Sequence, residues 1–287
     1  MNYFERARKF KAKKRLGQNF LVDGTAIDRI IEAAKISSED IIMEIGPGLG
    51  FVTEKAAKLA KKVVAVELDT DAIKELNKLN IENLEIIEGD ILKTDVSQIS
   101  KDHAQKLKVI ANIPYYITTP ILVHLLGEID EYNHKNRECI EEIILMVQYE
   151  VAKRITANRD NKSKEYGSIS VLSNFWADTE IITKVGARSF YPAPKVDSAV
   201  VRLKIRQTPS VNTNNAKLLR RIVHACFNAR RKTIKNALGL KGFSQELITK
   251  ALKQTGIDAS RRGETLTLEE FALLADNMDK LTANEKD

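Results

Sequence analysis

The 287-residue chain has 43% hydrophobic and 30% charged residues, a composition typical of folded rather than disordered proteins. No stretch approaches the roughly 18 apolar residues of a membrane span, and the basic N-terminus lacks the apolar run of a secretory signal. The two cysteines and four histidines show no ligand spacing. We therefore expect a reduced, cytoplasmic protein without a metal site.

The net charge of +7 and the pI of about 9.2 favour a polyanionic partner. The excess of basic residues concentrates in residues 6–15, "RARKFKAKKR", and again between Lys217 and Arg262. Solvated helix faces would also explain such segments. Because two separate basic segments flank a less basic middle, we expect both to contact nucleic acid, the first through Lys13, Lys14 and Arg15.

In the middle of the chain, short apolar segments rich in β-branched residues alternate with helical patterns. This alternation predicts βαβ units and a mostly parallel sheet with both faces covered. The expected strands are residues 40–46, 62–69, 84–90, 106–113 and 140–148, with two more at 179–186 and 198–206 that pair antiparallel at an edge. After residue 207 the chain is helical and basic. We therefore predict an α/β, Rossmann-like domain at 1–207 that includes a basic N-terminal arm, and a helical RNA-binding domain at 208–287.

Polar groups follow three successive expected strands. The turn "EIGPGLG" (44–50) follows the first, Glu67 ends the second and Asp90 ends the third. Glycines let backbone N–H groups approach a ligand, although such turns also serve packing alone. Glu67 suits ribose hydroxyls and Asp90 an adenine amino group. Three strand ends that face one crevice indicate a site for an adenosine-containing cofactor.

The cofactor can be a nicotinamide dinucleotide or S-adenosylmethionine, since both contain adenosine. Pro47 removes an N–H group that a pyrophosphate would use, and Glu44 would repel a pyrophosphate. The same carboxylate suits a cationic amino-acid tail. The loop therefore favours S-adenosylmethionine.

The stretch "NIPY" (112–115) ends the fourth expected strand beside this crevice. The side-chain oxygen of Asn112 and a backbone carbonyl, such as that of Ile113, can hold both hydrogens of an exocyclic amine and aim its lone pair at a methyl group. Pro114 fixes the turn, and Tyr115 can stack on a flipped base. Alternatively, the stretch is a surface turn with a buried tyrosine.

Six motifs in this order resemble the ribosomal RNA adenine N6-dimethyltransferase family and span nearly the whole chain. They are "LGQNFL" (16–21), "EIGPGLG", "VELD", "EGD", "NIPYYITTP" and "FYPAPKVDSAVV" (190–201). The resemblance implies a Rossmann-like methyltransferase that uses S-adenosylmethionine to dimethylate adenines in ribosomal RNA. The family's motif often has Asn after the Tyr, whereas this chain has Tyr116, for which we expect altered packing rather than lost activity.

Site roles carried over from the family are expectations of this resemblance. Asn19 and Leu21 would close over the cofactor, and Gly46 and Gly48 would pass its amino-acid end. Glu67 would hold the ribose and Asp90 the adenine, with Asn112 beside both cofactor and target. Tyr115 would stack on one face of the target base and Phe190 on the other, unless Phe190 only anchors its proline-rich loop.

The C-terminal motifs "HACFNARRKTIKNAL" (224–238) and "GIDASRRGETLTLEEFALLAD" (256–276) resemble the branch that dimethylates two adjacent adenosines near the 3′ end of small-subunit RNA. Arg230, Arg231 and Lys232 are expected to bind phosphates from a helix. Alternatives are the macrolide-resistance branch, which modifies large-subunit RNA, and a non-catalytic assembly or transcription factor of the same fold. We expect a monomer that takes an assembled or nearly assembled small subunit as its substrate and contributes to its biogenesis.

Overall fold

The computed structural model describes residues 2–158 and 164–284. The chain divides into two compact units, one formed by Met1–Leu126, Asn133–Lys153 and Asp178–Ile205, and the other by Gly127–Tyr132, Arg154–Ala177 and Arg206–Asp287. The break after Ile205 lies close to the expected start of the helical domain. Two earlier segments also join the second unit, and nothing in their sequence pattern indicated this.

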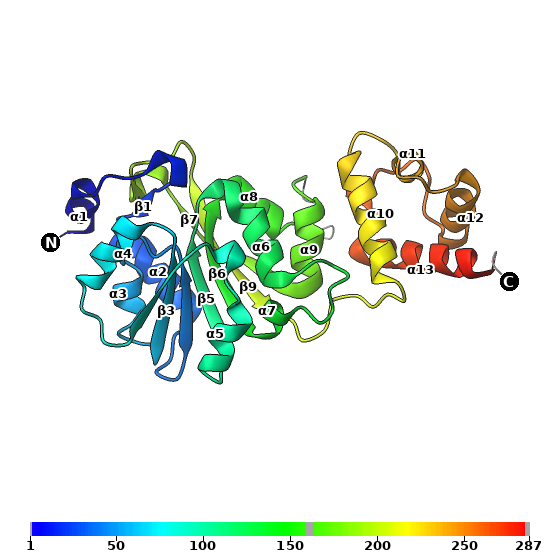
Figure 1. Ribbon diagram of the computed structural model, residues 1–287. Helices are drawn as coiled ribbons and strands as arrows, with labels where there is room; N and C mark the ends of the chain where they lie inside the picture. The colour runs from blue at the N-terminus through cyan, green and yellow to red at the C-terminus, as the bar shows by residue number, and fades with distance from the viewer. Residues whose placement is uncertain (1, 159–163, 285–287) are drawn as a thin grey trace. The chain divides into compact units, whose positions relative to one another are not determined.

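The first unit is built on a seven-stranded sheet of order β4-β3-β2-β5-β6-β9-β7, with helices on both sides (Figure 1). The strands are β2 (Ile41–Ile45), β3 (Lys62–Glu67), β4 (Leu84–Glu88), β5 (Leu107–Asn112), β6 (Ile140–Gln148), β7 (Ala177–Val185) and β9 (Ser198–Ile205). The first five pair in parallel, and β9 runs antiparallel to β6. The sheet confirms the predicted α/β, Rossmann-like fold.

Central strand β2 is buried along its whole length, as a parallel strand covered on both faces must be. The chain turns outward from β2 in two directions, through β3 to β4 on one side and through β5 to β6 on the other. The order of the strands therefore reverses between β2 and β5. In open α/β sheets a ligand crevice forms at such a reversal, outside the carboxyl ends of the strands.

The first unit also contains helices and short 3₁₀ turns. They are α1 (Tyr3–Lys9), η1 (Lys14–Leu16), α2 (Gly24–Ala34), α3 (Thr53–Ala56), α4 (Thr70–Asn77), η2 (Ile91–Lys93), α5 (Val96–Asp102), η3 (Tyr115–Ile117), α6 (Thr118–Leu126), α7 (Lys135–Glu138), α8 (Tyr149–Ile155) and η4 (Ala187–Ser189). Asp23, Asp69 and Asp95 cap α2, α4 and α5 by accepting hydrogen bonds from first-turn N–H groups. No helix in the described ranges is long and apolar enough to cross a membrane.

A second, two-stranded ladder ties the N-terminal segment to a distant part of the chain. Strand β1 (Phe20–Leu21) pairs antiparallel with β8 (Phe190–Tyr191), so that Leu21 stands opposite Phe190. The N–H group of Val22 also donates to the carbonyl of Ser189. We call residues 13–21 the strap, because the ladder fixes one end of this segment.

The second unit contains α9 (Ser168–Trp176), α10 (Ala216–Asn228), α11 (Ile234–Gly239), α12 (Gln245–Thr255), η5 (Gly263–Thr265) and α13 (Leu268–Asn284). Asn215, Thr233 and Ser244 cap α10, α11 and α12. As expected from the sequence, the described part of the chain after residue 207 contains helices and no strand.

Candidate active site

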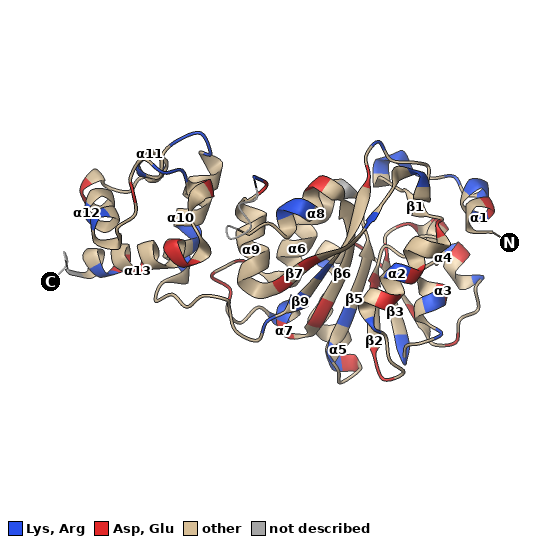
Figure 2. Ribbon diagram, turned by 180° about the vertical axis from the view of Figure 1, so that it is seen from behind, with Lys and Arg blue, Asp and Glu red and all other residues tan. Residues whose placement is uncertain are grey.

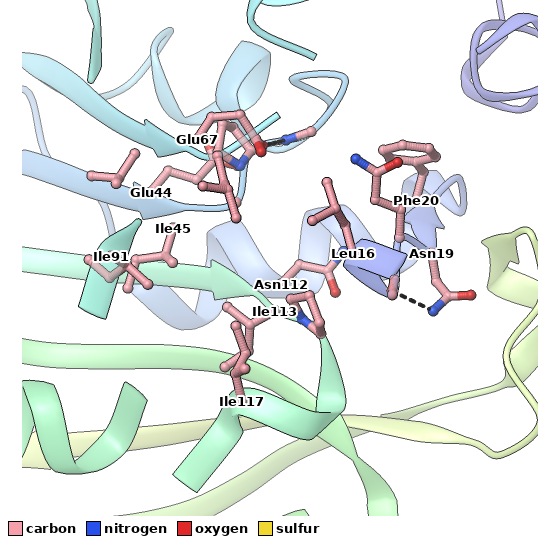
Figure 3. A pocket seen from close by; sticks show the side chains of 18 of the residues that line it. Leu16, Asn19, Phe20, Glu44, Ile45, Glu67, Ile91, Asn112, Ile113 and Ile117 are labelled. Atoms are coloured by element: carbon pink, nitrogen blue, oxygen red, sulfur yellow. Dashed lines mark hydrogen bonds between the residues drawn. The ribbon is translucent and has the colours of Figure 1, made fainter. Parts of the chain in front are cut away.

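A pocket lies at the carboxyl ends of β2, β3, β4 and β5, where the strand order reverses (Figure 3). Four segments contribute its walls: the strap, the glycine turn after β2, the ends of β3 and β4, and the loop after β5. The lining residues are Leu16 to Leu21, Glu44 to Leu49, Phe51, Val52, Val66 to Leu68, Gly89 to Ile91, Asn112 to Pro114, Tyr116 and Ile117. The predicted residues Asn19, Leu21, Gly46, Gly48, Glu67, Asp90, Asn112 and Pro114 are all among them.

The glycine turn needs residues without side chains at two points. Gly46 and Gly48 have φ values of 66° and 56°, in the left-handed region that favours glycine. A Cβ on Gly48 would come within 3.0 Å of the Phe20 ring in the strap. A Cβ on Gly46 would stand 3.7 Å from the carbonyl oxygen of Asn112. Gly48 therefore needs to stay small for the turn to lie against the strap, whereas Gly46 has ordinary contact distances and is favoured by its φ alone.

Two backbone N–H groups fix the carboxylate of Glu67. Its Oε2 accepts a hydrogen bond of 3.0 Å from the N–H of Gly48, and its Oε1 accepts one of 2.8 Å from the N–H of Asp69. The residue is 7% exposed, and burial raises the pKa of its carboxyl although these donors act in the opposite direction. Each oxygen keeps a lone pair, so the carboxylate can accept hydrogen bonds from two neighbouring hydroxyl groups.

Glu44 brings a second buried carboxyl group to the same wall. It is 4% exposed and accepts a hydrogen bond of 2.6 Å from the Thr53 hydroxyl. Burial, together with the nearby charge of Glu67, raises its pKa to about 7. Within the described ranges, no lysine or arginine forms an ion pair with it. A cationic ligand in the pocket would therefore supply the counter-charge that Glu44 lacks.

Asp90 stands where β4 ends and η2 begins. Its Oδ1 accepts from the N–H of Leu92 at 3.0 Å, and Ile91 beside it presents an apolar side chain to the pocket. This places one acceptor next to an apolar surface, the combination that a flat heterocycle with an amino group requires.

Asn112 is the last residue of β5, and the loop that carries Ile113 and Pro114 follows it directly. No hydrogen bond holds the Asn112 side-chain amide among the residues that the structure describes. Figure 3 shows Asn112 next to Ile113 in the pocket, below Glu67 and Leu16 in this view. The amide is thus free to bind a group that enters the pocket. The side chain of Tyr115 is outside those that the structure describes, so its predicted stacking role stays a prediction.

Phe190 does not have the position that we predicted. It is 3% exposed and packs in the core of the first unit, and it does not line the pocket. The β1–β8 ladder buries it, because Leu21 of the strap pairs directly opposite. In this structure Phe190 therefore packs as an apolar anchor of its loop, and its stacking on a target base stays a prediction.

Lys13 also departs from the prediction. Its ammonium group donates to Asp69 Oδ1 at 2.5 Å and to Asp71 Oδ2 at 2.7 Å. These pairs occupy the side chain that we expected to bind phosphate. Lys14 and Arg15 are exposed, as an RNA contact requires.

The cluster Arg230, Arg231 and Lys232 lies in the turn between α10 and α11, and not on a helix as predicted (Figure 2). Helix α10 ends at Asn228, since Ala229 has non-helical φ and ψ of −122° and 43°. Arg230 is partly engaged, with Nε 3.3 Å from Glu264 Oε2 and an Nη donating to the carbonyl of Tyr166. Arg231 and Lys232 are exposed.

The sequence analysis missed several residues that build the pocket. Gln18, Phe20, Ile91, Ile117 and Tyr116 line it. Gln18 and Phe20 belong to the quoted motif "LGQNFL", which was a usable signal. Ile91 directly follows Asp90, and Ile117 is the second residue after the "NIPY" stretch, but single apolar residues in such loops carry no signal of their own.

A family model described as ribosomal RNA adenine dimethylase matches residues 9–280. The chain belongs to this family. It is 42% identical over 271 residues to the ribosomal RNA small subunit methyltransferase A of Clostridium botulinum, covering 93% of this chain and 94% of that protein. The namesake in Clostridium perfringens is 42% identical over 277 residues, covering 96% and 93% of the two chains.

Solved structures of two related enzymes share the fold. A dimethyladenosine transferase from Plasmodium falciparum superposes with a TM-score of 0.72 at 27% identity, covering 92% of this chain and 97% of that one. The 23S rRNA methyltransferase ErmE superposes with a TM-score of 0.69 at 25% identity, covering 91% and 100%. The protein is therefore an S-adenosylmethionine-dependent ribosomal RNA adenine dimethyltransferase, and the predicted family and cofactor are confirmed.

The residues of the pocket fit S-adenosylmethionine. Glu44 offers a buried carboxyl group without a counter-ion, which suits a cationic donor better than a dinucleotide pyrophosphate. Glu67 offers a bidentate acceptor for vicinal hydroxyls, and Asp90 and Ile91 offer an acceptor beside an apolar wall. Pro47 removes one backbone donor from the turn.

Proposed function

We propose that this protein transfers methyl groups to N6 of two adjacent adenosines near the 3′ end of small-subunit ribosomal RNA, giving N6,N6-dimethyladenosine. The observation that carries the proposal is the free Asn112 amide at the edge of a pocket that fits the methyl donor. The names of the Clostridium relatives support the small-subunit assignment.

Different residues of the pocket would bind different parts of the methyl donor. Glu67 would accept hydrogen bonds from the ribose hydroxyls of the donor, Asp90 would accept one from its adenine, and Glu44 would balance its positive charge. Asn19 and Leu21 would cover the donor from the strap. When bound, the donor supplies a methyl group on a positively charged sulfur.

Asn112 and the loop after it would prepare the nucleophile. The N6 lone pair of adenine is delocalised into the ring, which makes it a poor nucleophile. The Asn112 side-chain oxygen and the Ile113 carbonyl would accept hydrogen bonds from the two N6 hydrogens and favour a pyramidal nitrogen whose lone pair faces the methyl group. Pro114 would hold this turn without adding a competing donor. Because a carboxamide is no base, the displaced proton would leave to solvent.

The RNA substrate would be a small subunit in an assembled or nearly assembled state. The proposal rests on exposed Lys14 and Arg15 in the first unit and exposed Arg231 and Lys232 in the second. Two compact units that each carry exposed cations suit a folded RNA with phosphates at several places. A short hairpin that contains the target should therefore be a poor substrate. We propose that the protein works as a monomer in the cytoplasm, where subunits assemble.

A methyl-transfer assay on separated subunits tests the function. Small and large subunits from cells that lack this methylation would be incubated with the protein and radiolabelled S-adenosylmethionine, and the labelled nucleotides would be mapped by mass spectrometry. We expect label in two adjacent adenosines of the small subunit. Label in the large subunit alone would assign the protein to the branch of ErmE. If neither the small nor the large subunit is labelled, the alternative of a non-catalytic binding factor with the same fold would be favoured.

A further inference from the structure

Tyr116 is an exposed aromatic residue at the rim of the pocket. It is 66% exposed, yet it lines the pocket together with Pro114 and Ile117. We expected only altered packing at this position. An aromatic ring that is two-thirds exposed is a poor packing element, because most of its apolar surface stays in water.

The strap holds one edge of this ring. A Cβ on Gly17 would stand 3.4 Å from Tyr116 Cε1 and 3.1 Å from Pro114 Cβ. The backbone of Gly17 therefore lies against the Cδ1–Cε1 edge of the tyrosine. Gly17 has a φ of 61°, so a glycine suits this position for two reasons. A ring supported along one edge loses little entropy when a second flat group stacks on its face.

Two exposed cations lie close along the chain to Gly17, the strap residue that contacts the ring. Lys14 and Arg15 precede Gly17 by three and two residues and are exposed. An exposed aromatic face together with exposed cations in the segment that contacts it is a combination that binds single-stranded nucleic acid, with bases on the ring and phosphates on the cations.

We propose that Tyr116 stacks on the base that neighbours the target adenosine, and so holds the strand while the target base occupies the pocket. This proposal rests on the function proposed above. The two methylated adenosines are adjacent in the RNA. The base that stacks on Tyr116 would therefore be the other adenine when one of the two positions is in the pocket, and a different base when the other position is. Tyr116 would then be a determinant of substrate binding that sets how well each of the two positions is modified.

The test compares Tyr116→Ala with Tyr116→Phe, which keeps the ring. Small subunits that lack the methylation serve as substrate, and both kcat/KM and the affinity for S-adenosylmethionine are measured. We expect Tyr116→Ala to lower kcat/KM roughly 5- to 100-fold, as for loss of one base–aromatic stack, and to change cofactor affinity less than about twofold. Tyr116→Phe should stay within about threefold of the wild type, since the stack needs the ring and not the hydroxyl.

A second substrate identifies the base that is stacked. Subunits would be reconstituted with RNA in which one of the two adjacent adenosines is replaced by an abasic nucleotide. The abasic nucleotide should lower the activity of the wild type. It should lower the activity of Tyr116→Ala much less, because this variant already lacks the stack. Equal losses from the abasic site in both proteins would overturn the proposal, as would reduced cofactor affinity in the Ala variant or unchanged kcat/KM. If the wild type does not methylate the small subunit at all, the proposed function fails instead.

Discussion

The Lys13 ammonium group bonds to Asp69, whose side chain is fully buried and which also accepts a hydrogen bond of 2.6 Å from the Gln18 amide. Lys13 and Gln18 belong to the strap, and Asp69 follows the pocket carboxylate Glu67 by two residues. The N–H of Asp69 in turn donates to Glu67. The strap is therefore fastened to the residue that orients the proposed ribose acceptor.

Removing the Lys13 amine should open the strap. In Lys13→Met, the carboxylate of Asp69 loses a charged partner, and we expect the affinity for S-adenosylmethionine to fall roughly three- to tenfold. Trypsin should cleave faster after Lys14 and Arg15. Lys11→Met, at an exposed lysine two residues earlier, is the matched control and should behave as wild type. Calorimetry and timed proteolysis give the two readouts. A Lys13 variant with normal affinity for S-adenosylmethionine and a normal cleavage rate would show that the Lys13–Asp69 ion pair does not hold the strap.

Glu44 should make cofactor binding depend on pH. Its folded-state pKa of about 7 lies above the ordinary value because the group is buried, so the carboxyl is neutral below that pH and ionised above it. A positively charged ligand binds the ionised form better. The affinity of the wild type should therefore rise with pH through this range, by at most about tenfold per unit, and level off above it.

The matched variant for Glu44 is Glu44→Gln, which keeps the shape and cannot ionise. It should bind S-adenosylmethionine more weakly at pH 8 and lose the part of the pH dependence that comes from the protein. Any dependence of the affinity on pH that remains in this variant comes from titration of the ligand's own amine. Identical pH profiles for wild type and Gln variant would show that Glu44 does not face the positive charge.

Charge reversal at Arg231 and Lys232 should weaken binding to the small subunit and leave the affinity for S-adenosylmethionine unchanged. Each lost phosphate contact should flatten the dependence of log K on log salt by roughly 0.7–0.9. Arg230 is best left intact, because its bonds to Glu264 and Tyr166 serve the second unit itself. Glu246→Lys/Lys250→Glu, which exchanges charges within one helix, is a control that keeps net charge constant. A salt dependence equal to that of the wild type would exclude this turn from RNA binding.

The sheet and the strand-end residues could be predicted from the sequence, because parallel strands end at a common edge. Once 40–46, 62–69 and 106–113 are assigned as strands, the glycine turn, Glu67 and Asn112 must meet there. The burial of Phe190 could not be predicted. It depends on a ladder of two-residue strands that lie about 170 residues apart, and such short segments have no detectable period.

The ion pairs of Lys13 and the position of Arg230 to Lys232 in a turn were not expected, for related reasons, while their contacts with RNA stay predictions. A run of basic residues shows charge but not whether a carboxylate lies opposite, and Asp69 is 56 residues away from Lys13. The end of α10 has neither glycine nor proline to mark it. The turn after it is closed by a hydrogen bond of 2.8 Å from the N–H of Lys232 to the carbonyl of Ala229, which the sequence pattern does not indicate.

The central claim is that Asn112 acts on the target amine and not on the methyl donor. The most direct measurement is the single-turnover rate of Asn112→Ala on unmethylated small subunits at saturating S-adenosylmethionine, together with its affinity for the cofactor. The account predicts a rate lower by roughly 10²-fold or more, as for loss of a preorganised polar partner, with cofactor affinity within a few-fold of the wild type. A variant that turns over at the wild-type rate, or whose defect disappears at saturating cofactor, would contradict it.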